Sequence, residues 1–304
     1  MEQREEGEEF MDTARYKAFI ASVKTGSFSR AAEDLNYTTS GVSQLVTALE
    51  EELNLLLFHR SRKGVKLTVD GERLYPLILN FLRQEERIYQ MANEISGLRV
   101  GDISISAYPS VCASWLPDII SRFQTLHPGV GFKINDDGVR RHIIEDLNNG
   151  SADIGFLSNH HDLAGEWIEL EKNPLLALVG FESPYAQWDS LPLRECATAT
   201  MIECAHGKNP DQSYVFAQYD IVPNIVYTTL TSSTATAMAS RNMGVFITNE
   251  LSTHMWDFPV KMLPLDPPQY IELGMAVSPV AYGSPAVKAF VRFFRENFRA
   301  GALT

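Results

Sequence analysis

The chain has 304 residues, of which 45% are hydrophobic and 21% are charged, and its formal net charge is −12. The length is too great for one ordinary core and suits two or three compact units, and the composition excludes a disordered polymer. The acidic balance excludes a uniformly basic nucleic-acid binder, although a local basic surface can still bind DNA.

The chain carries no sign of a membrane or secretory protein. No apolar run reaches spanning length, and the acidic N-terminus lacks the apolar core of a signal peptide. We therefore expect a cytoplasmic protein without a membrane partner. Residues 1–10 carry a net charge of −4, residues 12–70 carry +1 and the remainder carries −9. We expect residues 1–10 to be a disordered acidic lead.

The N-terminal part predicts three short helices. The first, over 12–24, ends at Gly26, which fits a glycine C-cap. The second covers 29–35, and the third covers 39–50 with Thr38 as its N-cap. Apolar residues recur at helical spacing in the third helix: Val42, Leu45, Val46 and Leu49.

The third predicted helix has a polar face opposite its apolar one. Hydroxyl and amide side chains make up this face: Thr39, Ser40, Ser43, Gln44 and Thr47. Glutamine can bridge adenine and Ser or Thr can serve several bases, so the face suits base edges in the major groove. The pattern favours a helix-turn-helix. The alternative is an ordinary two-helix corner with a solvated polar face.

The stretch 57–68 predicts a β-hairpin with apolar flanks. Three basic residues, Arg60, Arg62 and Lys63, lie near its turn. Directly behind a helix-turn-helix, such a hairpin is typical of a wing that lies along a phosphate backbone. The alternative is a solvated turn.

Residues 71–95 predict a helix about 37 Å long at 1.5 Å per residue. Apolar residues fall at alternating three- and four-residue steps, with Glu85 in the remaining position: Leu74, Ile78, Phe81, Ile88, Ala92 and Ile95. This spacing predicts a coiled-coil-like seam that pairs two copies of the chain. The alternative is a helix packed on its own domain. Residues 96–101 predict a hinge.

From Asp102 onward, short strands alternate with helices. The predicted strands cover 103–107, 131–135, 154–157, 175–180, 199–203, 225–228, 244–248 and 271–277, and the predicted helices cover 115–126, 143–148, 234–241 and 284–299. Such alternation predicts a mostly parallel sheet with helices on both faces, built as two halves of similar kind.

Many N-terminal residues match one register of a known family. They are Phe19, Gly26 to Ala32, Leu35, Val42, Ser43, Leu49, Glu50, Leu57, Phe58, Arg60, Leu67, Thr68 and Gly71. This stretch resembles the N-terminal domain of LysR-type transcriptional regulators, whose chains usually start close to Met11, so the natural start is left open between Met1 and Met11. Gln44 and Thr47 stand where the family often has basic residues, which would weaken phosphate-driven binding.

The resemblance implies an α/β multidomain protein with a winged helix-turn-helix at 11–70 and a linker and dimerisation helix at 71–97. A two-lobed, periplasmic-binding-protein-like effector-binding domain would follow at 98–304, with lobe I at about 101–163 and 268–304 and lobe II at about 164–267. The residues assigned to DNA binding are Ser29, Arg30, Thr38, Thr39, Ser40, Ser43, Gln44, Thr47, Arg60, Arg62 and Lys63.

The implied function is that of a bacterial regulator and not of an enzyme. Its partners would be double-stranded DNA, a small-molecule effector, RNA polymerase and further copies of itself, as a homodimer or homotetramer. A dimer would place two recognition helices about one helical turn of DNA apart, or a multiple of it. The alternative is a small-solute-binding protein with an accessory helical module.

Ligands of open α/β sheets bind beyond the carboxyl ends of the strands, close to helix N-termini. The residues assigned to the effector are Tyr108, Pro109, Ser110, Thr200, Ile202, Thr231, Ser232 and Phe246. Register with the family places Tyr108 and Ser110 at usual ligand-contacting positions. The hydroxyls suit a small organic acid, such as a carboxylate, and no cofactor is expected. The alternative is that each hydroxyl only caps a helix.

Two further groups of residues invite a chemical reading. Cys112, Cys196 and Cys204 show no CxxC pairing and predict free buried thiols, with a redox pair between Cys196 and Cys204 as the alternative. The stretch 160–162, His-His-Asp, is read as a surface loop rather than a metal site, because it lacks a third ligand.

Overall fold

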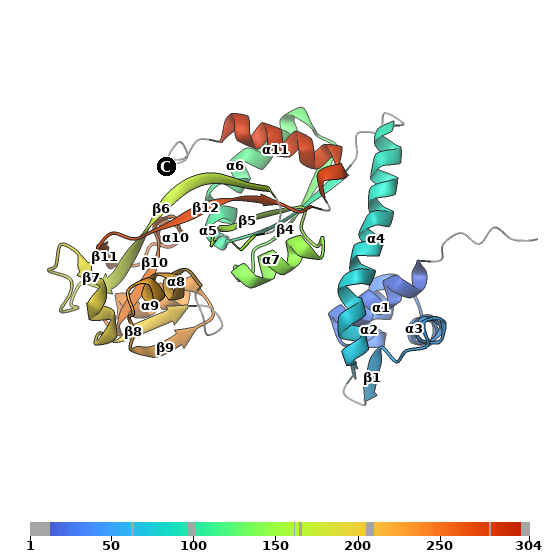
Figure 1. Ribbon diagram of the computed structural model, residues 1–304, viewed down its shortest axis with the longest axis horizontal. Helices are drawn as coiled ribbons and strands as arrows, with labels where there is room; N and C mark the ends of the chain where they lie inside the picture. The colour runs from blue at the N-terminus through green and yellow to red at the C-terminus, as the bar shows by residue number, and fades with distance from the viewer. Residues whose placement is uncertain are drawn as a thin grey trace, which may run out of the picture. The chain divides into compact units, whose positions relative to one another are not determined.

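The computed structural model describes residues 13–61, 64–95, 101–160, 162–163, 166–204, 210–279 and 281–298. It forms two compact units that divide in sequence between Ser96 and Gly97. The predictions for the acidic lead, for hinge residues 96–100 and for Arg62 and Lys63 fall outside the described residues. Figure 1 labels most of the elements.

Three helices open the N-terminal unit, as predicted: α1 (Ala14–Thr25), α2 (Phe28–Leu35) and α3 (Thr39–Leu53). Gly26 ends α1 in the left-handed region at φ 65°, where a residue without Cβ is favoured. The Thr38 hydroxyl accepts a hydrogen bond from the N–H of Gly41 and so caps α3. The apolar faces meet in a core that includes Phe19, Ala31, Val42, Val46 and Leu49.

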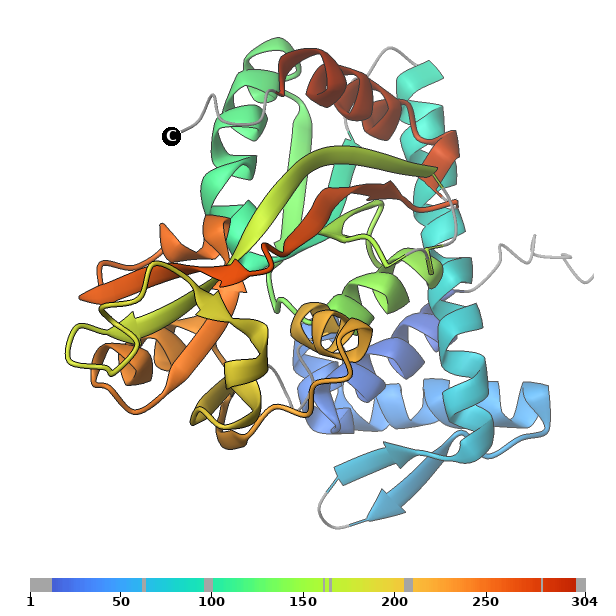
Figure 2. The same cartoon turned by 60° about the vertical axis from the view of Figure 1, so that its left-hand side comes forward.

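A hairpin follows α3, made of β1 (Phe58–Ser61) and β2 (Gly64–Leu67). The strands are antiparallel, with Phe58 opposite Leu67. Phe58 is buried, and its ring packs against those of Phe19 and Phe28. The aromatic contacts anchor the hairpin to the helices, and Figure 2 shows the strands projecting from them. The predicted hairpin is confirmed.

The helix α4 (Val69–Ile95) begins directly after the hairpin. The first half of its predicted seam packs inside its own unit. Ile78 is buried in the core, and the ring of Phe81 meets that of Tyr16 edge-on, with centroids 5.0 Å apart. The prediction that the whole seam faces a second copy is therefore wrong for this half, because α1 covers it.

Glu85, the polar position of the seam, also faces α1. Its Oε1 accepts from the Thr13 hydroxyl at 2.9 Å, and its Oε2 lies 3.1 Å from Lys17 Nζ. Beyond this point the described apolar side chains are uncovered within the unit, since Ile88 and Tyr89 are more than half exposed. The second half of the seam therefore keeps an apolar surface.

Lobe I of the C-terminal unit is a sheet with helices on both faces. Its elements are β3 (Gly101–Ala107), α5 (Pro109–Ser114), α6 (Leu116–Leu126), β4 (Val130–Asn135), α7 (Arg140–Asn148), β5 (Ile154–Ser158), η2 (Ala281–Gly283) and α11 (Pro285–Asn297). The parallel strands lie in the order β4-β3-β5. Figures 1 and 2 show α6 and α11 on one face and α7 on the other.

Lobe II has strands and helices of its own. Its elements are β7 (Leu191–Pro192), η1 (Leu193–Ala197), β8 (Met201–Cys204), α8 (Pro210–Gln218), β9 (Ile225–Thr229), α9 (Ser232–Ser240), β10 (Val245–Asn249), α10 (Glu250–Thr253) and β11 (Val260–Asp266). The parallel strands lie in the order β10-β8-β9.

Two long strands, β6 (Glu166–Gly180) and β12 (Tyr270–Val277), join the lobes. The first part of β6 pairs with β12 beside β5, and its last residues pair with β10 and β11. These pairings are antiparallel, so the sheet is mixed and the prediction of a mostly parallel sheet needs correction. Each lobe has a parallel centre that the antiparallel strands complete.

Candidate functional site

The polar face of α3 lies on the surface of the N-terminal unit. Gln44 is exposed, while Ser43 and Thr47 are half-buried. Thr38, Thr39 and Ser40 are exposed at the N-terminus of the helix, which is the end that HTH proteins direct at base edges. Ser29 and Arg30 are exposed at the start of α2. The geometry therefore leaves the predicted reading face open to a partner.

Arg60 of the hairpin reaches back to this same face. Its guanidinium donates to Ser43 Oγ at 3.3 Å, to Thr47 Oγ1 at 2.9 Å and to Glu50 Oε2 at 2.6 Å. It also lies 5.2 Å from the centroid of the Phe28 ring. Each hydroxyl accepts from Arg60 and keeps its own hydrogen to donate outward. Arg60 thus orients the two hydroxyls instead of standing alone as a phosphate contact.

Glu50 connects α3 to the hairpin and is the residue that the sequence reading missed. Its side chain is 6% exposed, and its Oε1 accepts from the backbone N–H groups of Leu57 and Phe58 at 2.8 and 3.1 Å. Since Oε2 accepts from Arg60, one carboxylate holds both the start of the hairpin and its basic side chain. The family match at Glu50 was a usable signal, although spacing alone said only that the helix continued.

In the C-terminal unit, a polar network lies at the carboxyl ends of β3 and β5. Tyr108 follows β3, Ser158 is the last residue of β5, and their hydroxyl oxygens are 2.9 Å apart. Both residues are buried. This is the edge at which ligands of α/β sheets bind, as the sequence predicted for Tyr108.

Lobe II contributes a carboxylate to this network. Asp211, near the N-terminus of α8, accepts from Ser158 Oγ at 2.5 Å, and its Oδ1 lies 2.9 Å from His160 Nε2. The His160 ring stacks on that of Tyr214 with centroids 5.0 Å apart. The carboxyl ends of lobe I strands and the start of α8 therefore meet around Asp211.

Arg140, at the start of α7, completes the network from the side of lobe I. It is buried, donates from Nε to the carbonyl of Ser158 at 3.0 Å and forms a bidentate pair with Asp162. The hydrogen bond from Arg140 lowers the pKa of Asp162. Burial, reinforced by the charge of Asp211, raises the pKa of Tyr108, so this hydroxyl stays a neutral donor.

The remaining predicted effector residues divide into two groups. Pro109 and Ser110 begin α5 beside Tyr108, and Thr231 and Ser232 begin α9 beyond the carboxyl end of β9. Cys204 Sγ at the end of β8 lies 3.6 Å from Ser232 Oγ. The carboxyl end of β8 is therefore beside the start of α9. Thr231 caps α9 by accepting from the N–H of Thr234, as the alternative reading expected.

Thr200, Ile202 and Phe246 lie away from the carboxyl ends of the lobe II strands, where ligands of α/β sheets bind. Thr200 precedes β8, so it stands at the amino end of the strand whose carboxyl end lies near Ser232. Ile202 and Phe246 are 0% exposed and pack with Leu178, Cys204, Ala235 and Ala239 under α9. Their apolar side chains serve the core of lobe II, and we remove all three from the candidate contacts.

The described residues of 160–162 lie in a loop, as predicted, and Asp162 is exposed, but the loop is more than a solvated connection. His160 and Asp162 both take part in the network, while His161 lies outside the described residues. Sequence spacing could not pair His160 with Asp211 or Asp162 with Arg140, because each partner comes from a distant element. Among the described residues, no group of three His, Cys, Asp or Glu side chains could hold a metal.

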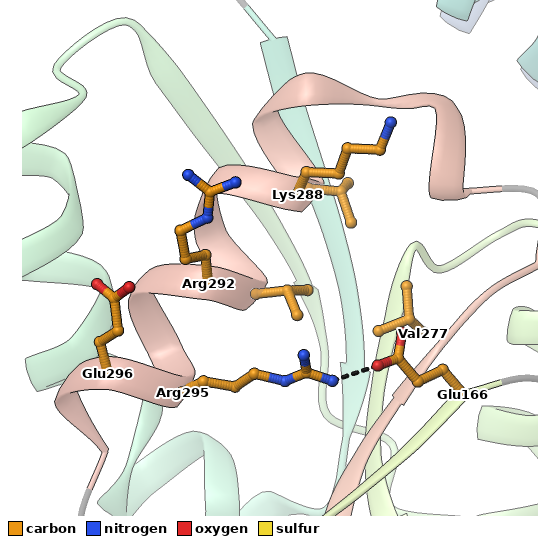
Figure 3. A pocket seen from close by; sticks show the side chains of 8 residues that line it. Glu166, Val277, Lys288, Arg292, Arg295 and Glu296 are labelled. Atoms are coloured by element: carbon orange, nitrogen blue, oxygen red, sulfur yellow. Dashed lines mark hydrogen bonds and ion pairs between the residues drawn. The ribbon is translucent and has the colours of Figure 1, made fainter.

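A separate pocket of about 490 Å³ lies between α11 and the strands β6 and β12. Figure 3 shows Lys288, Arg292 and Arg295 along one side of α11, with Arg295 paired to Glu166. Val277, Val287 and Val291 give the pocket an apolar wall. None of the predicted effector residues lines it.

Two further observations concern the cysteines and the possibility of a membrane-spanning helix. Cys112, Cys196 and Cys204 are free thiols, and the latter two are buried. Within the described ranges, no helix is both long enough and apolar enough to cross a membrane.

Comparison with known proteins places both units in one family. Residues 14–72 match the family model for bacterial regulatory helix-turn-helix proteins of the lysR family, and residues 96–299 match that for the LysR substrate binding domain. The uncharacterized HTH-type transcriptional regulator YvbU of Bacillus subtilis is 27% identical over 293 residues, which cover 95% of this chain and 100% of that protein.

Two solved structures extend the likeness. CbnR, a LysR family transcriptional regulator also solved with its target DNA, has a TM-score of 0.68 at 17% identity and covers 94% of this chain and 99% of its own. The effector binding domain of QuiR in complex with shikimate has a TM-score of 0.56 at 25% identity and covers 66% of this chain and 99% of its own.

Proposed function

The chain belongs to the LysR family of DNA-binding transcriptional regulators, and we propose that α3 reads duplex DNA under the control of a small molecule bound in the C-terminal unit. The observation that supports α3 most directly is its exposed polar face. Gln44 projects freely, and Arg60 holds the hydroxyls of Ser43 and Thr47 with their hydrogens free to donate. Arg30 supplies an exposed cation at the start of α2, and the predicted cations Arg62 and Lys63 would add charge at the wing.

Fluorescence anisotropy with the intergenic DNA upstream of the gene tests this part of the proposal. The chain should bind that duplex more tightly than a random duplex of equal length, with a difference that survives moderate salt. The matched control is Glu52→Ala, because Glu52 is exposed on the same helix and outside the reading face. Equal affinity for the two duplexes at every salt concentration would refute sequence reading.

We also propose that α4 pairs two copies through its second half. Ile88 and Tyr89 are exposed on this helix, whereas the first half is covered by α1. A pair would present two α3 helices to a roughly palindromic site. Ile88→Glu should therefore shift the mass measured by light scattering toward the monomer, while Glu86→Ala, a change of an exposed polar neighbour, should not.

The effector is proposed to lie at the carboxyl ends of β3 and β5 and beside the start of α9. Tyr108, Pro109 and Ser110 of lobe I and Thr231 and Ser232 of lobe II are its candidate contacts. Hydroxyls and helix N-termini favour a small organic acid, and the relative QuiR was solved with shikimate, which is such an acid.

A thermal-shift screen of carboxylates against the wild type and Ser110→Ala tests this location. A ligand that stabilises the wild type should stabilise Ser110→Ala less. Arg292→Ala is the control, since Arg292 lines the pocket at α11 and none of the candidate contacts. A response lost in Arg292→Ala and kept in Ser110→Ala would move the effector to the α11 pocket.

The expectations of a cytoplasmic location, of RNA polymerase as a partner and of homodimer or homotetramer remain predictions. The curated relatives are named as transcriptional regulators, which agrees with a role other than catalysis.

A further inference from the structure

Lobe I directs hydrogen-bond donors at a carboxylate that belongs to lobe II. Asp211 is 8% exposed, and its Oδ1 lies 2.5 Å from Ser158 Oγ and 2.9 Å from His160 Nε2. A carboxylate can only accept, so both lobe I groups donate to it. Two donors from one lobe therefore converge on one oxygen of the other.

Tyr108 extends this arrangement by one further hydrogen bond. Ser158 has a single hydroxyl hydrogen, which Asp211 receives, so the Tyr108 hydroxyl must donate to Ser158 Oγ across their 2.9 Å contact. Burial raises the pKa of Tyr108, which keeps that hydroxyl protonated and able to donate. Tyr108, Ser158 and His160 thus form a set of donors that ends on one carboxylate.

Among the described residues, the cation Arg140 lies beside the donor set and is paired with Asp162. Arg140 forms its bidentate pair with Asp162, and it touches the donor set through the carbonyl of Ser158. The described hydrogen bonds to Asp211 come from a hydroxyl and an imidazole, which recognise a carboxylate by the geometry of their hydrogen bonds. Such a set is a carboxylate-binding site, whichever molecule supplies the carboxylate.

We propose that Ser158 and His160, supported by Tyr108, form a carboxylate-binding subsite that Asp211 fills as an internal ligand, and that an acidic effector binds by displacing Asp211. The proposal deepens the proposed function and rests on it, because it names how the effector's acid group is held. The exchange needs no change in net charge at the subsite, since one carboxylate replaces another.

Two consequences follow because Asp211 is covalently part of the chain. Asp211 competes at a high effective concentration, so simple monocarboxylates should bind the wild type weakly. An effector that displaces Asp211 must gain the necessary binding free energy from its other contacts. Once Asp211 is displaced, the start of α8 loses its bonds to lobe I, and effector binding is thereby linked to the position of lobe II.

Chemical rescue of Asp211→Ala tests the proposal. The full chain is heated at pH 7.5 with increasing sodium formate, which matches the atoms that the substitution removes, and with equal concentrations of sodium chloride. We expect Asp211→Ala to melt lower than the wild type and to gain several degrees with formate. The wild type should not respond, because its subsite is filled, and neither protein should respond to chloride.

Two further variants keep the outcome decisive. Asp211→Asn fills the same volume with an amide and should show no gain with formate, whether or not Asp211→Ala proves difficult to purify. The double variant Asp211→Ala with Ser158→Ala should lose the gain, because the main donor is gone. A formate shift of Asp211→Ala that is no larger than that of the wild type or of Asp211→Asn, or a gain that persists in the double variant, would overturn the proposal.

The test separates this inference from the proposed function. DNA binding by Asp211→Ala is measured in the same buffer with and without formate. A chain that is rescued by formate and binds no upstream DNA would contradict the proposed function and leave the subsite standing. A chain that binds its DNA and responds to an effector, but shows no formate rescue, would contradict the subsite alone.

Discussion

Glu50→Ala should loosen the hairpin of the N-terminal unit more than any single surface change. Glu50 is 6% exposed, and its carboxylate accepts the backbone N–H groups of Leu57 and Phe58. Alanine would leave two buried donors without their acceptor, at about 1–3 kcal/mol each. The lost pair with Arg60 adds little, about 0–1 kcal/mol, because that guanidinium is 41% exposed. Together, these losses should cost about 2–7 kcal/mol.

Hydrogen exchange on the full chain measures this loss where it occurs. At 1.4 kcal/mol per tenfold, protection of the Leu57 and Phe58 amides should fall by about 30-fold to 100,000-fold. All four tryptophans lie beyond residue 100, so their fluorescence reports unfolding of the C-terminal unit, which should not change. Anisotropy should then show weaker DNA binding, because Arg60 loses its carboxylate partner.

Two matched variants sharpen the measurement. Glu50→Gln keeps an oxygen for the two N–H groups and should lose far less protection than Glu50→Ala. Glu52→Ala removes only the exposed pair with Arg15, which is worth about 0–1 kcal/mol. The reasoning would be refuted if Glu50→Ala and Glu52→Ala exchanged at the same rate.

Three other outcomes are expected. Gln44→Ala should cost about 1–3 kcal/mol of specific DNA binding by anisotropy and leave random DNA unaffected, and an equal loss on both would remove Gln44 from base reading. Burial raises the pKa of Cys112 and of Cys196 to about 12, so their thiolates are scarce at pH 7.5. Ellman's reagent should label both slowly in the folded chain and rapidly in urea, and fast labelling of the folded chain would contradict this. The pKa of Asp162 is lowered by the hydrogen bond from Arg140, so its contribution to stability is present above about pH 4, its unfolded pKa, and is lost as pH falls through the lower folded value. Acid unfolding followed by tryptophan fluorescence should lose part of its pH dependence in Asp162→Asn, and an unchanged profile would show that the pair contributes nothing.

The sequence located features that depend on near neighbours. The caps at Gly26 and Thr38, the hairpin at 57–68 and the family are all confirmed, because their signals are short-range patterns or matches in one register. The polar face of α3 is exposed for the same reason, since helical periodicity fixes which residues share a side.

The sequence failed where distant elements decide the environment. Phe246 and Ile202 were predicted as ligand contacts, yet helix α9 covers them. The sequence around these two residues does not predict that packing. The predicted strand over 199–203 already had Thr200 at its amino end, as the structure does, whereas ligands of α/β sheets bind beyond the carboxyl ends. Asp211 lay in a stretch without strong periodicity, so neither α8 nor its contact with lobe I could be foreseen.

The long strands β6 and β12 have a consequence for how the C-terminal unit folds. Strand β6 hydrogen-bonds to β12 in lobe I and to β10 and β11 in lobe II, so melting either lobe would strip the other of part of its central ladder. Calorimetry should therefore record one cooperative endotherm for this unit instead of two. For the same reason, a fragment cut to a single lobe should not be expected to fold in isolation.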